Sequence, residues 1–181
     1  MKRIDTPLEG CFIIEPKVFG DQRGFFFESF NQKVFSEITG VHTPFVQDNH
    51  SKSTKGVLRG LHFQIKHAQG KLVRVIRGEV VDSVVDLRKS SKTFGKSFTI
   101  VLSEENKKQL WIPPGFAHGF LVKSDVAEFV YKTTDYYHPE FERTLMWNDP
   151  SLNIDWQIDY SPQLSEKDQK GKCLSEVETY P

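Results

Sequence analysis

The sequence predicts a mainly β fold of the sandwich, jelly-roll or small-barrel kind. Aromatic residues make up 13% of the chain and include 15 Phe, a composition that favours strands. Gly and Pro interrupt the chain often, so the expected strands are short and joined by turns. Because at least seven such runs follow one another at short intervals, we expect one core and a single domain over residues 1–181.

Residues 1–45 are expected to hold the N-terminal strands and a short helix. The segment 10–19 predicts a strand with a proline break, and a turn at 21–24 leads into a strand over Phe25–Phe30. A helix is expected over Asn31–Ile38, because Asn is a favourable N-cap and Gly40 supplies a stop.

Runs rich in Val, Ile, Phe and Thr predict the strands that follow. Two of them, within Lys71–Arg88, are expected to fold around a glycine turn or bulge. After Trp147 the pattern fades, so residues 148–181 are expected to form an irregular tail with a short helix or loop at Ser165–Gly171. The other predicted strands are 46–51, 57–64, 97–102, 109–112, 119–122 and 126–133.

Composition and charge exclude several classes of protein. Lys plus Arg number 24 and Asp plus Glu number 24, so nucleic-acid binding through bulk positive charge is not expected. Cys11 and Cys173 lie far apart and indicate neither a disulfide framework nor a cysteine-rich zinc site. The N-terminus lacks the apolar core of a signal peptide, and no apolar run is long enough to span a bilayer. We therefore expect a soluble cytoplasmic protein with no membrane partner.

His62 lies in a β-like run, two residues after a glycine that permits close backbone approach. An inward-facing imidazole is a natural base, although a lone histidine is more often a hydrogen-bonded core residue. Arg59 changes this balance, because burying a second cationic group so close is costly unless an anion pairs with it. Strict alternation places Arg59 and His62 on opposite faces, so we expect Gly60 to distort the strand and bring both to one cavity.

His118 follows Pro113-Pro-Gly115, a turn that fixes the entry angle of the next strand. Together with His62 this motif resembles the cupin-type jelly roll, a double-stranded β-helix with a few short helices. Metal-binding cupins carry His-x-His and a Glu in the first motif, whereas Gln64 stands here in place of the second His. Two imidazoles without a third nitrogen ligand or a clearly placed carboxylate make a poor transition-metal site. No metal or other cofactor is therefore expected, and His118 is expected to make a polar contact or handle protons.

Tyr131 and Lys71 are candidates for a proton donor and a cation in the interior. Period-2 counting sets Ala127, Phe129 and Tyr131 on one face, and a phenol has an unperturbed pKa of about 10. Taken alone, Tyr131 fits a core aromatic residue whose hydroxyl has a backbone partner. Lys71 begins a strand, where a solvated lysine is usual, and its functional value depends on closeness to a developing oxyanion.

Other polar residues are candidates for binding a nucleotide sugar. Arg23, Arg59 and Lys167 can bind a diphosphate, because guanidinium and ammonium groups match phosphate oxygens. For Arg23, which lies on a turn, simple surface charge is the commoner role. Gln47 and Asn49 share a strand face and can bond a sugar or base, with a buried polar ladder as the plain alternative.

Taken together, the motifs resemble the dTDP-4-dehydrorhamnose 3,5-epimerases, metal-free cupin-like enzymes of dTDP-rhamnose biosynthesis. Each motif is weak by itself, but eight of them in order over nearly the whole chain are highly specific. The motifs are Asp21-Gln-Arg-Gly-Phe-Phe26, Gln47-Asp-Asn-His-Ser51, Val57-Leu-Arg-Gly-Leu-His-Phe-Gln64, Gln69-Gly-Lys-Leu-Val-Arg-Val75, Gln109-Leu-Trp-Ile-Pro-Pro-Gly-Phe-Ala-His-Gly-Phe120, Glu128-Phe-Val-Tyr-Lys132, Trp147-Asn-Asp-Pro150 and Leu164-Ser-Glu-Lys-Asp168.

The resemblance implies a role for each candidate. His62 is the implied base, oriented by Asp168, with Tyr131 as the opposing acid and Lys71 as the oxyanion stabiliser. It also implies a homodimer with exchanged N-terminal strands, through which Arg23, Phe26 and Glu28 reach the partner's site. The residues implied to hold the nucleotide sugar are Arg23, Phe26, Glu28, Gln47, Asn49, Arg59, His118, Tyr137, Glu142 and Lys167, with Phe26 and Tyr137 as the aromatic clamp on thymine.

The implied reaction converts dTDP-4-dehydro-6-deoxy-D-glucose to dTDP-4-dehydro-L-rhamnose. The 4-keto group acidifies the hydrogens on carbons 3 and 5, because the carbanion left behind delocalises as an enolate, and reprotonation from the opposite face inverts each carbon. The alternatives are a monofunctional 3- or 5-epimerase or a ketoisomerase on a dTDP-4-keto sugar. A metal-dependent cupin and a non-catalytic nucleotide-sugar binding module are less favoured alternatives.

Overall fold

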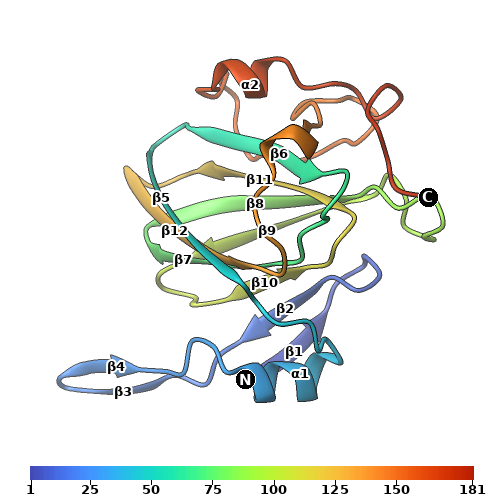
Figure 1. The fold of residues 1–181 in the computed structure, drawn as a ribbon. Coiled ribbons are helices and arrows are strands. Elements are labelled where there is room, and N and C mark those ends of the chain that lie inside the picture. Colours follow the sequence, from blue (N-terminus) through green and yellow to red (C-terminus); the bar gives the residue numbers. More distant parts are fainter.

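Two antiparallel sheets pack face to face in the structure, a computed structural model that describes residues 1–181 (Figure 1). This jelly-roll sandwich agrees with the mainly β fold that the sequence predicts. The six-stranded sheet contains, in spatial order, β1 (Lys2–Asp5), β2 (Phe12–Glu15), β10 (Gln109–Ile112), β7 (Lys71–Arg77), β12 (Val126–Thr133) and β5 (Gln47–Thr54). The five-stranded sheet contains β13 (Glu142–Thr144), β6 (Leu58–Gln64), β11 (Phe116–Val122), β8 (Glu79–Asp86) and β9 (Ser97–Ser103).

At Gly78 the chain passes from the six-stranded sheet to the five-stranded sheet. The sequence predicts strands on both sides of it, and both exist, but β7 pairs with β10 and β12 while β8 pairs with β11 and β9. Gly78 has a φ of 75°, and a Cβ there would lie 2.1 Å from the carbonyl oxygen of Val126. Only glycine fits so tight a corner. The expected turn therefore joins the layers of the sandwich and does not form a hairpin.

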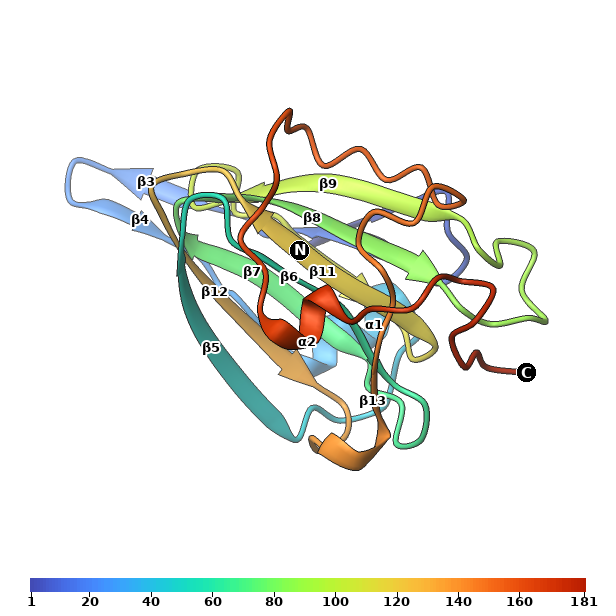
Figure 2. The same ribbon diagram turned by 90° about the horizontal axis from the view of Figure 1, so that it is seen from above.

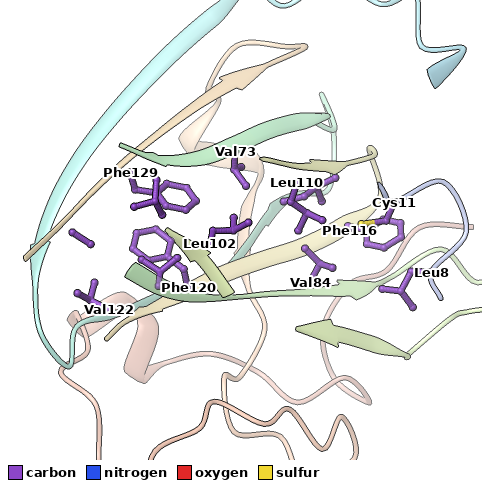
Figure 3. Packing of buried hydrophobic residues seen from close by; sticks show 14 residues of the cluster. Leu8, Cys11, Val73, Val84, Leu102, Leu110, Phe116, Phe120, Val122 and Phe129 are labelled. Carbon is purple, nitrogen blue, oxygen red and sulfur yellow. The ribbon is translucent and has the colours of Figure 1, made fainter. Parts of the chain in front are cut away.

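Apolar side chains on alternate strand positions fill the space between the sheets (Figure 3). Val73 and Val75 of β7 belong to the same cluster as Val80 and Val84 of β8. Phe120 and Phe129 come from opposite sheets and stack with ring centroids 4.2 Å apart. Burial of each such side chain contributes about 1.5–3 kcal/mol, so this layer fixes how the two sheets face each other.

An exposed hairpin of β3 (Phe19–Asp21) and β4 (Gly24–Phe26) extends away from the sandwich (Figure 1). The strand predicted over Phe25–Phe30 is wrong beyond Phe26. A two-stranded ribbon has no neighbour to extend it, and Phe30 instead packs edge-on against Phe45, with ring centroids 5.1 Å apart. Residues 27–30 therefore return to the body of the protein as irregular chain.

The predicted N-terminal helix is present as α1 (Gln32–Thr39). The side chain of Asn31 accepts a hydrogen bond from the amide of Val34 and caps the helix, and Gly40 ends it with a φ of 75°. Its buried Phe35 packs with Trp111 on the outer face of the six-stranded sheet. The strand β1, which the sequence did not indicate, pairs with β2 at the edge of this sheet.

The tail after β13 lies across the outer face of the five-stranded sheet (Figure 2). It contains the short helix α2 (Glu166–Gln169), within the predicted segment, and follows a 3₁₀ turn at Pro139–Phe141. Isolated parallel bridges join it to the sheet and nearby loops at Val57–Gln163, Leu145–Lys172 and Arg88–Tyr180. The helices α1 and α2 are both too short and too polar to cross a bilayer.

Candidate active site

A cavity of about 360 Å³ opens between the two sheets beside Phe120 and Phe129. Its wall on the six-stranded sheet comes from alternate positions of β5 and β12 and from Lys71 at the start of β7. The five-stranded sheet supplies β6 and β11. The predicted site residues that line this cavity are Gln47, Asn49, Arg59, His62, Lys71, His118, Tyr131, Tyr137, Glu142 and Lys167.

A local irregularity in β6 brings Arg59 and His62 to the same cavity. His62 pairs with His118 and Arg59 pairs with Phe120, so β6 has one more residue than β11 between these two pairs. Gly60 takes the extra position with a φ of 114°, and a Cβ there would lie 2.6 Å from the Cα of Gly119. The distortion predicted at Gly60 is confirmed, and the side chains of Arg59 and His62 both line the cavity.

His62 is bound to Asp168, as the resemblance implies. The imidazole Nε2 and the carboxylate Oδ1 lie 2.5 Å apart, and the hydroxyl of Ser165 donates to Oδ2 at 2.7 Å. Burial acts to raise the pKa of Asp168, but the hydrogen bond and charge of His62 and the bond from Ser165 outweigh burial, and the pKa is lowered. An ionised Asp168 accepts a hydrogen bond from the proton on Nε2 and orients the ring, which leaves the other ring nitrogen to act on a ligand.

Lys71 and Tyr131 face the cavity from β7 and β12 of the opposite sheet. Lys71 is 9% exposed, so the usual solvated lysine is excluded, and burial lowers its pKa to about 8 despite the opposing effect of Glu142 and Asp82. Burial, with a smaller contribution from Glu142, raises the pKa of Tyr131 and keeps the phenol protonated at neutral pH. The cavity thus holds a neutral acid and a readily titrated cation opposite His62.

Asp82 was missed in the sequence. It lies on β8 and binds His118, with 2.9 Å between Oδ2 and Nε2, and its other oxygen has no partner. Burial raises the pKa of Asp82, while His118 and Lys71 oppose the shift. A carboxylate among valines in an otherwise apolar run was the available signal. Asp168 was predicted beside His62 and Asp82 was not, and each of the two histidines is held by one of these carboxylates.

The residues present do not fit the metal site of metal-binding cupins. Gln64, in place of the second histidine, donates to the carbonyl oxygens of His67 and Tyr136 and accepts from the amide of His138. The Nε2 atoms of His62 and His118 are each occupied by a carboxylate. These nitrogen atoms and the Gln64 amide are thus committed to protein partners.

The mouth of the cavity carries groups suited to an anionic ligand. Arg59 donates through Nε to Ser53 at 2.9 Å, which leaves its terminal nitrogens available for a ligand. Glu142 accepts from both Lys167, at 2.9 Å, and the hydroxyl of Tyr137, at 3.1 Å. This carboxylate therefore fixes the cation and the ring in one arrangement.

A polar row lines one wall of the cavity. Gln47 donates to Asn49 at 3.0 Å, and both face the cavity with Ser51. The Ser51 hydroxyl is buried and has no hydrogen-bond partner. Ser51 was missed, although its period-2 relation to Gln47 and Asn49 marks the same face. An unpaired buried hydroxyl is a ready contact for a ligand.

Three predicted residues lie away from this cavity. Arg23 is on the exposed hairpin with its side chain paired to Asp21 at 2.6 Å, and Phe26 on the same hairpin is 71% exposed. Glu28 follows the hairpin and accepts a hydrogen bond from Asn31 at 3.1 Å. Within one chain, the structure does not bring them to the other site residues.

A jelly roll whose intersheet cavity holds a histidine–aspartate pair, a buried lysine and a tyrosine defines a cupin-like enzyme equipped for acid–base chemistry. Comparison with known families agrees, since the model of the dTDP-4-dehydrorhamnose 3,5-epimerase family matches residues 5–176. The chain belongs to this family.

Individual relatives match over nearly their whole length. The dTDP-4-dehydrorhamnose 3,5-epimerase of Shigella flexneri is 61% identical over 181 residues, covering 99% of each chain. That of Pseudomonas aeruginosa is 56% identical over 181 residues, covering 100% of each. A crystal structure of the Legionella pneumophila dTDP-6-deoxy-D-glucose-3,5-epimerase in complex with dTDP-4-keto-L-rhamnose superposes with a TM-score of 0.95 at 53% identity, over 98% of this chain and 94% of that one.

Proposed function

We propose that this protein catalyses the 3,5-epimerisation of dTDP-4-dehydro-6-deoxy-D-glucose to dTDP-4-dehydro-L-rhamnose. The observation that carries the proposal is that His62 and Tyr131 line one cavity from opposite sheets. Inversion of a carbon requires removal of a proton on one face and return of a proton on the other. Two proton-handling groups on facing walls meet that requirement, and the named relatives support the substrate.

In the proposed mechanism His62 removes the proton from carbon 3 or carbon 5. The electron pair of the C–H bond moves toward the 4-keto oxygen, so an enolate forms and the imidazole becomes an imidazolium that Asp168 stabilises. Tyr131 then gives its proton to the opposite face of the same carbon. The tyrosinate and the imidazolium return to their starting states by proton exchange with solvent before the next inversion.

Lys71 is proposed to stabilise the enolate oxygen. Its ammonium is buried, and in a site shielded from water a charged donor of this kind typically contributes about 2.7–4 kcal/mol to the transition state. A base typically contributes about 10²–10⁴-fold, so the histidine alone is not sufficient for an efficient enzyme. The ammonium and the imidazole therefore act together on the same enolate.

The nucleotide part of the substrate is proposed to lie at the mouth of the cavity. Arg59 and Lys167 would neutralise the diphosphate, while Gln47, Asn49 and His118 bond the sugar and base. The paired arrangement of Tyr137 and Glu142 supports a stacking position for the ring of Tyr137 against thymine.

We propose further that two chains form a homodimer with exchanged N-terminal strands. The exposed hairpin supports this, because Phe19, Phe25 and Phe26 are between 55% and 71% exposed in one chain. A partner that receives the hairpin would bury these rings and bring Arg23, Phe26 and Glu28 to its own cavity.

Free thiols at Cys11 and Cys173 support a reducing compartment such as the cytoplasm.

Proton NMR of the 4-keto-6-deoxyglucose nucleotide in deuterated water tests the reaction. The purified protein is expected to replace the hydrogens on carbons 3 and 5 with deuterium and to yield the doubly inverted sugar. Exchange and inversion at a single carbon would instead identify a monofunctional epimerase. Binding of the nucleotide sugar without exchange at either carbon would identify a binding module and refute the proposal.

Tyr131→Phe separates the two proton-handling groups in the same experiment. This variant keeps the ring and loses only the proton, so deuterium is expected to enter while the inverted product falls sharply. Normal yields of inverted product from Tyr131→Phe would exclude the phenol as the second acid.

A further inference from the structure

A second cluster of potential ligand groups lies outside the cavity, where two loops meet. His67 is on the β6–β7 loop, and Asp135 and His138 are on the segment between β12 and the 3₁₀ turn. One ligand atom from each of these three side chains lies within 4.8 Å of the other two. None of the three lines the cavity between the sheets. The cluster is thus independent of the acid–base site described above.

The backbone around this cluster is held by two glutamine side chains. Gln64 is 4% exposed and bonds the carbonyl oxygen of His67 at 2.8 Å and the amide of His138 at 2.7 Å. Gln69 donates to the carbonyl oxygen of Asp135 at 2.9 Å. The three residues are therefore placed next to one another by bonds that do not use their own ligand atoms. Their backbone positions are fixed in this way, while their side chains can still turn toward a metal.

We propose that His67, Asp135 and His138 bind a divalent transition metal of the Zn²⁺ class. Two imidazole nitrogens and one carboxylate oxygen are a donor set that Zn²⁺ accepts, with water as the fourth ligand. Tetrahedral zinc with bonds of about 2.0–2.2 Å needs ligand atoms about 3.4 Å apart, so the side chains must draw together when the metal binds. The histidine side chains are 49% and 33% exposed and have room to rotate.

The contacts that the metal must replace are weak. His67 faces Asp135 at 3.3 Å, His138 faces Glu140 at 3.6 Å, and the two imidazole rings stack with centroids 4.3 Å apart. Exposed polar contacts of this kind contribute little to stability. Losing these contacts therefore opposes metal binding only weakly.

Metal binding here would fix the rim of the cavity. Tyr137 lies between two of the proposed ligands; its amide donates to Gln47 at 3.1 Å and its hydroxyl bonds Glu142. A metal joining His67 to Asp135 and His138 clamps this segment to the β6–β7 loop. If the nucleotide site is as proposed above, the clamp restrains the ring that stacks on the base, but the metal site itself does not depend on that function.

Zinc titration calorimetry on the chelator-treated, desalted chain of residues 1–181 tests the proposal. The parent is expected to bind one Zn²⁺ per chain and to melt at a higher temperature with zinc present. His67→Asn and His138→Asn each remove one ligand on an exposed loop, so both variants should fold. Their zinc affinity should fall by more than the roughly 10–100-fold that loss of a mere supporting residue causes.

His50→Asn is the matched control, because His50 is also an exposed histidine that faces a carboxylate, Glu128, at 3.2 Å. It should bind zinc as the parent does. Co²⁺ provides a second readout, since a site with two histidines and a carboxylate should give a visible absorption band that His67→Asn and His138→Asn lose. Equal zinc binding by the parent and both ligand variants, or no binding by the parent, would overturn the proposal.

Discussion

The two histidine–aspartate pairs of the cavity have the same chemistry but different surroundings. The pair His62–Asp168 joins a strand to the C-terminal tail and keeps 23% of its imidazole exposed. The pair His118–Asp82 joins the neighbouring strands β11 and β8, and its two side chains are 8% and 0% exposed. The protein therefore builds one accessible pair and one buried pair a short way apart on the same wall.

Both pairs have the same residue types, so their difference comes from the hydrogen bonds that each carboxylate accepts. Both oxygens of Asp168 accept hydrogen bonds, and the pKa of Asp168 is lowered, so this carboxylate stays ionised and is suited to stabilise a proton that the imidazole takes from a ligand. Asp82 has one unpaired oxygen and a raised pKa because of burial. The first pair is thus suited to take up a proton, and the second is suited to hold a fixed position.

The largest expected effect is on the rate. His62→Ala should lower solvent deuterium uptake by about 10²–10⁴-fold at both carbons, because the base is lost. His118→Ala should retain more exchange than His62→Ala, since His118 is assigned to contact and not to proton removal. Both rates can be measured by NMR at saturating substrate. Equal losses in the two variants would erase the distinction between the pairs.

For the free energy of unfolding, measured in urea, the buried pair should matter more than the accessible pair. His118→Ala leaves the buried carboxyl group of Asp82 without its hydrogen-bond partner, and an unsatisfied buried polar group costs up to about 3 kcal/mol. Asp168→Ala leaves a partly exposed imidazole that water can reach, so a smaller loss of about 1 kcal/mol is expected. A larger loss for Asp168→Ala would show that the His62–Asp168 pair contributes more to the free energy of unfolding.

Asp82 of the buried pair also acts on Lys71 and so on the pH dependence of the reaction. If the ammonium is the active form, the rate should fall by about tenfold per pH unit above a pKa of about 8. Asp82→Asn removes an anion that opposes this lowering, so the alkaline limb should move to lower pH. Lys71→Arg keeps its charge and should abolish the limb, and a limb that persists in Lys71→Arg would assign it to another group.

The smallest effect is on stability in acid, and it has opposite signs for the two aspartates. The pKa of Asp168 is lowered in the folded state, so its stabilisation is present above the unfolded pKa of about 3.9 and is lost as pH falls through the folded pKa. The pKa of Asp82 is raised, so its ionisation lowers stability as pH rises from about 3.9 through the folded pKa.

Urea unfolding of Asp168→Asn and Asp82→Asn between about pH 3 and pH 7 measures these two contributions. Asp168→Asn should reduce the rise in stability with pH, whereas Asp82→Asn should steepen it. Shifts of the same sign in both variants would contradict the assigned pKa directions.

Much of the sandwich could be predicted because each strand carries its own signal. The strand over residues 126–133 and the helix capped by Asn31 were found from alternation and capping alone. The pairing of strands was not accessible, as Gly78 shows, because a glycine corner between sheets and a hairpin turn have the same local sequence. Periodicity describes a strand and its faces, but not the partner that it meets.

The same limit applied to the site. Inward positions of Tyr131 and the distortion at Gly60 followed from counting residues. Asp82 was not found, because its partner His118 lies 36 residues further along the chain. Asp168 is 106 residues from His62 and entered only through the family resemblance. Contacts over such distances are made by the fold, and a single sequence does not record them.

The contact between Gly60 and Gly119 constrains how this scaffold can be altered. A Cβ at Gly60 would meet the Cα of Gly119 at 2.6 Å, and a Cβ at Gly119 would meet the carbonyl oxygen of Arg59 at 2.6 Å. The backbones of β6 and β11, which carry His62 and His118, thus touch without an intervening side chain. A side-chain substitution therefore cannot change the distance between them. Libraries aimed at new substrates should leave this glycine pair untouched and vary the opposite wall, where longer or shorter side chains can reshape the chamber.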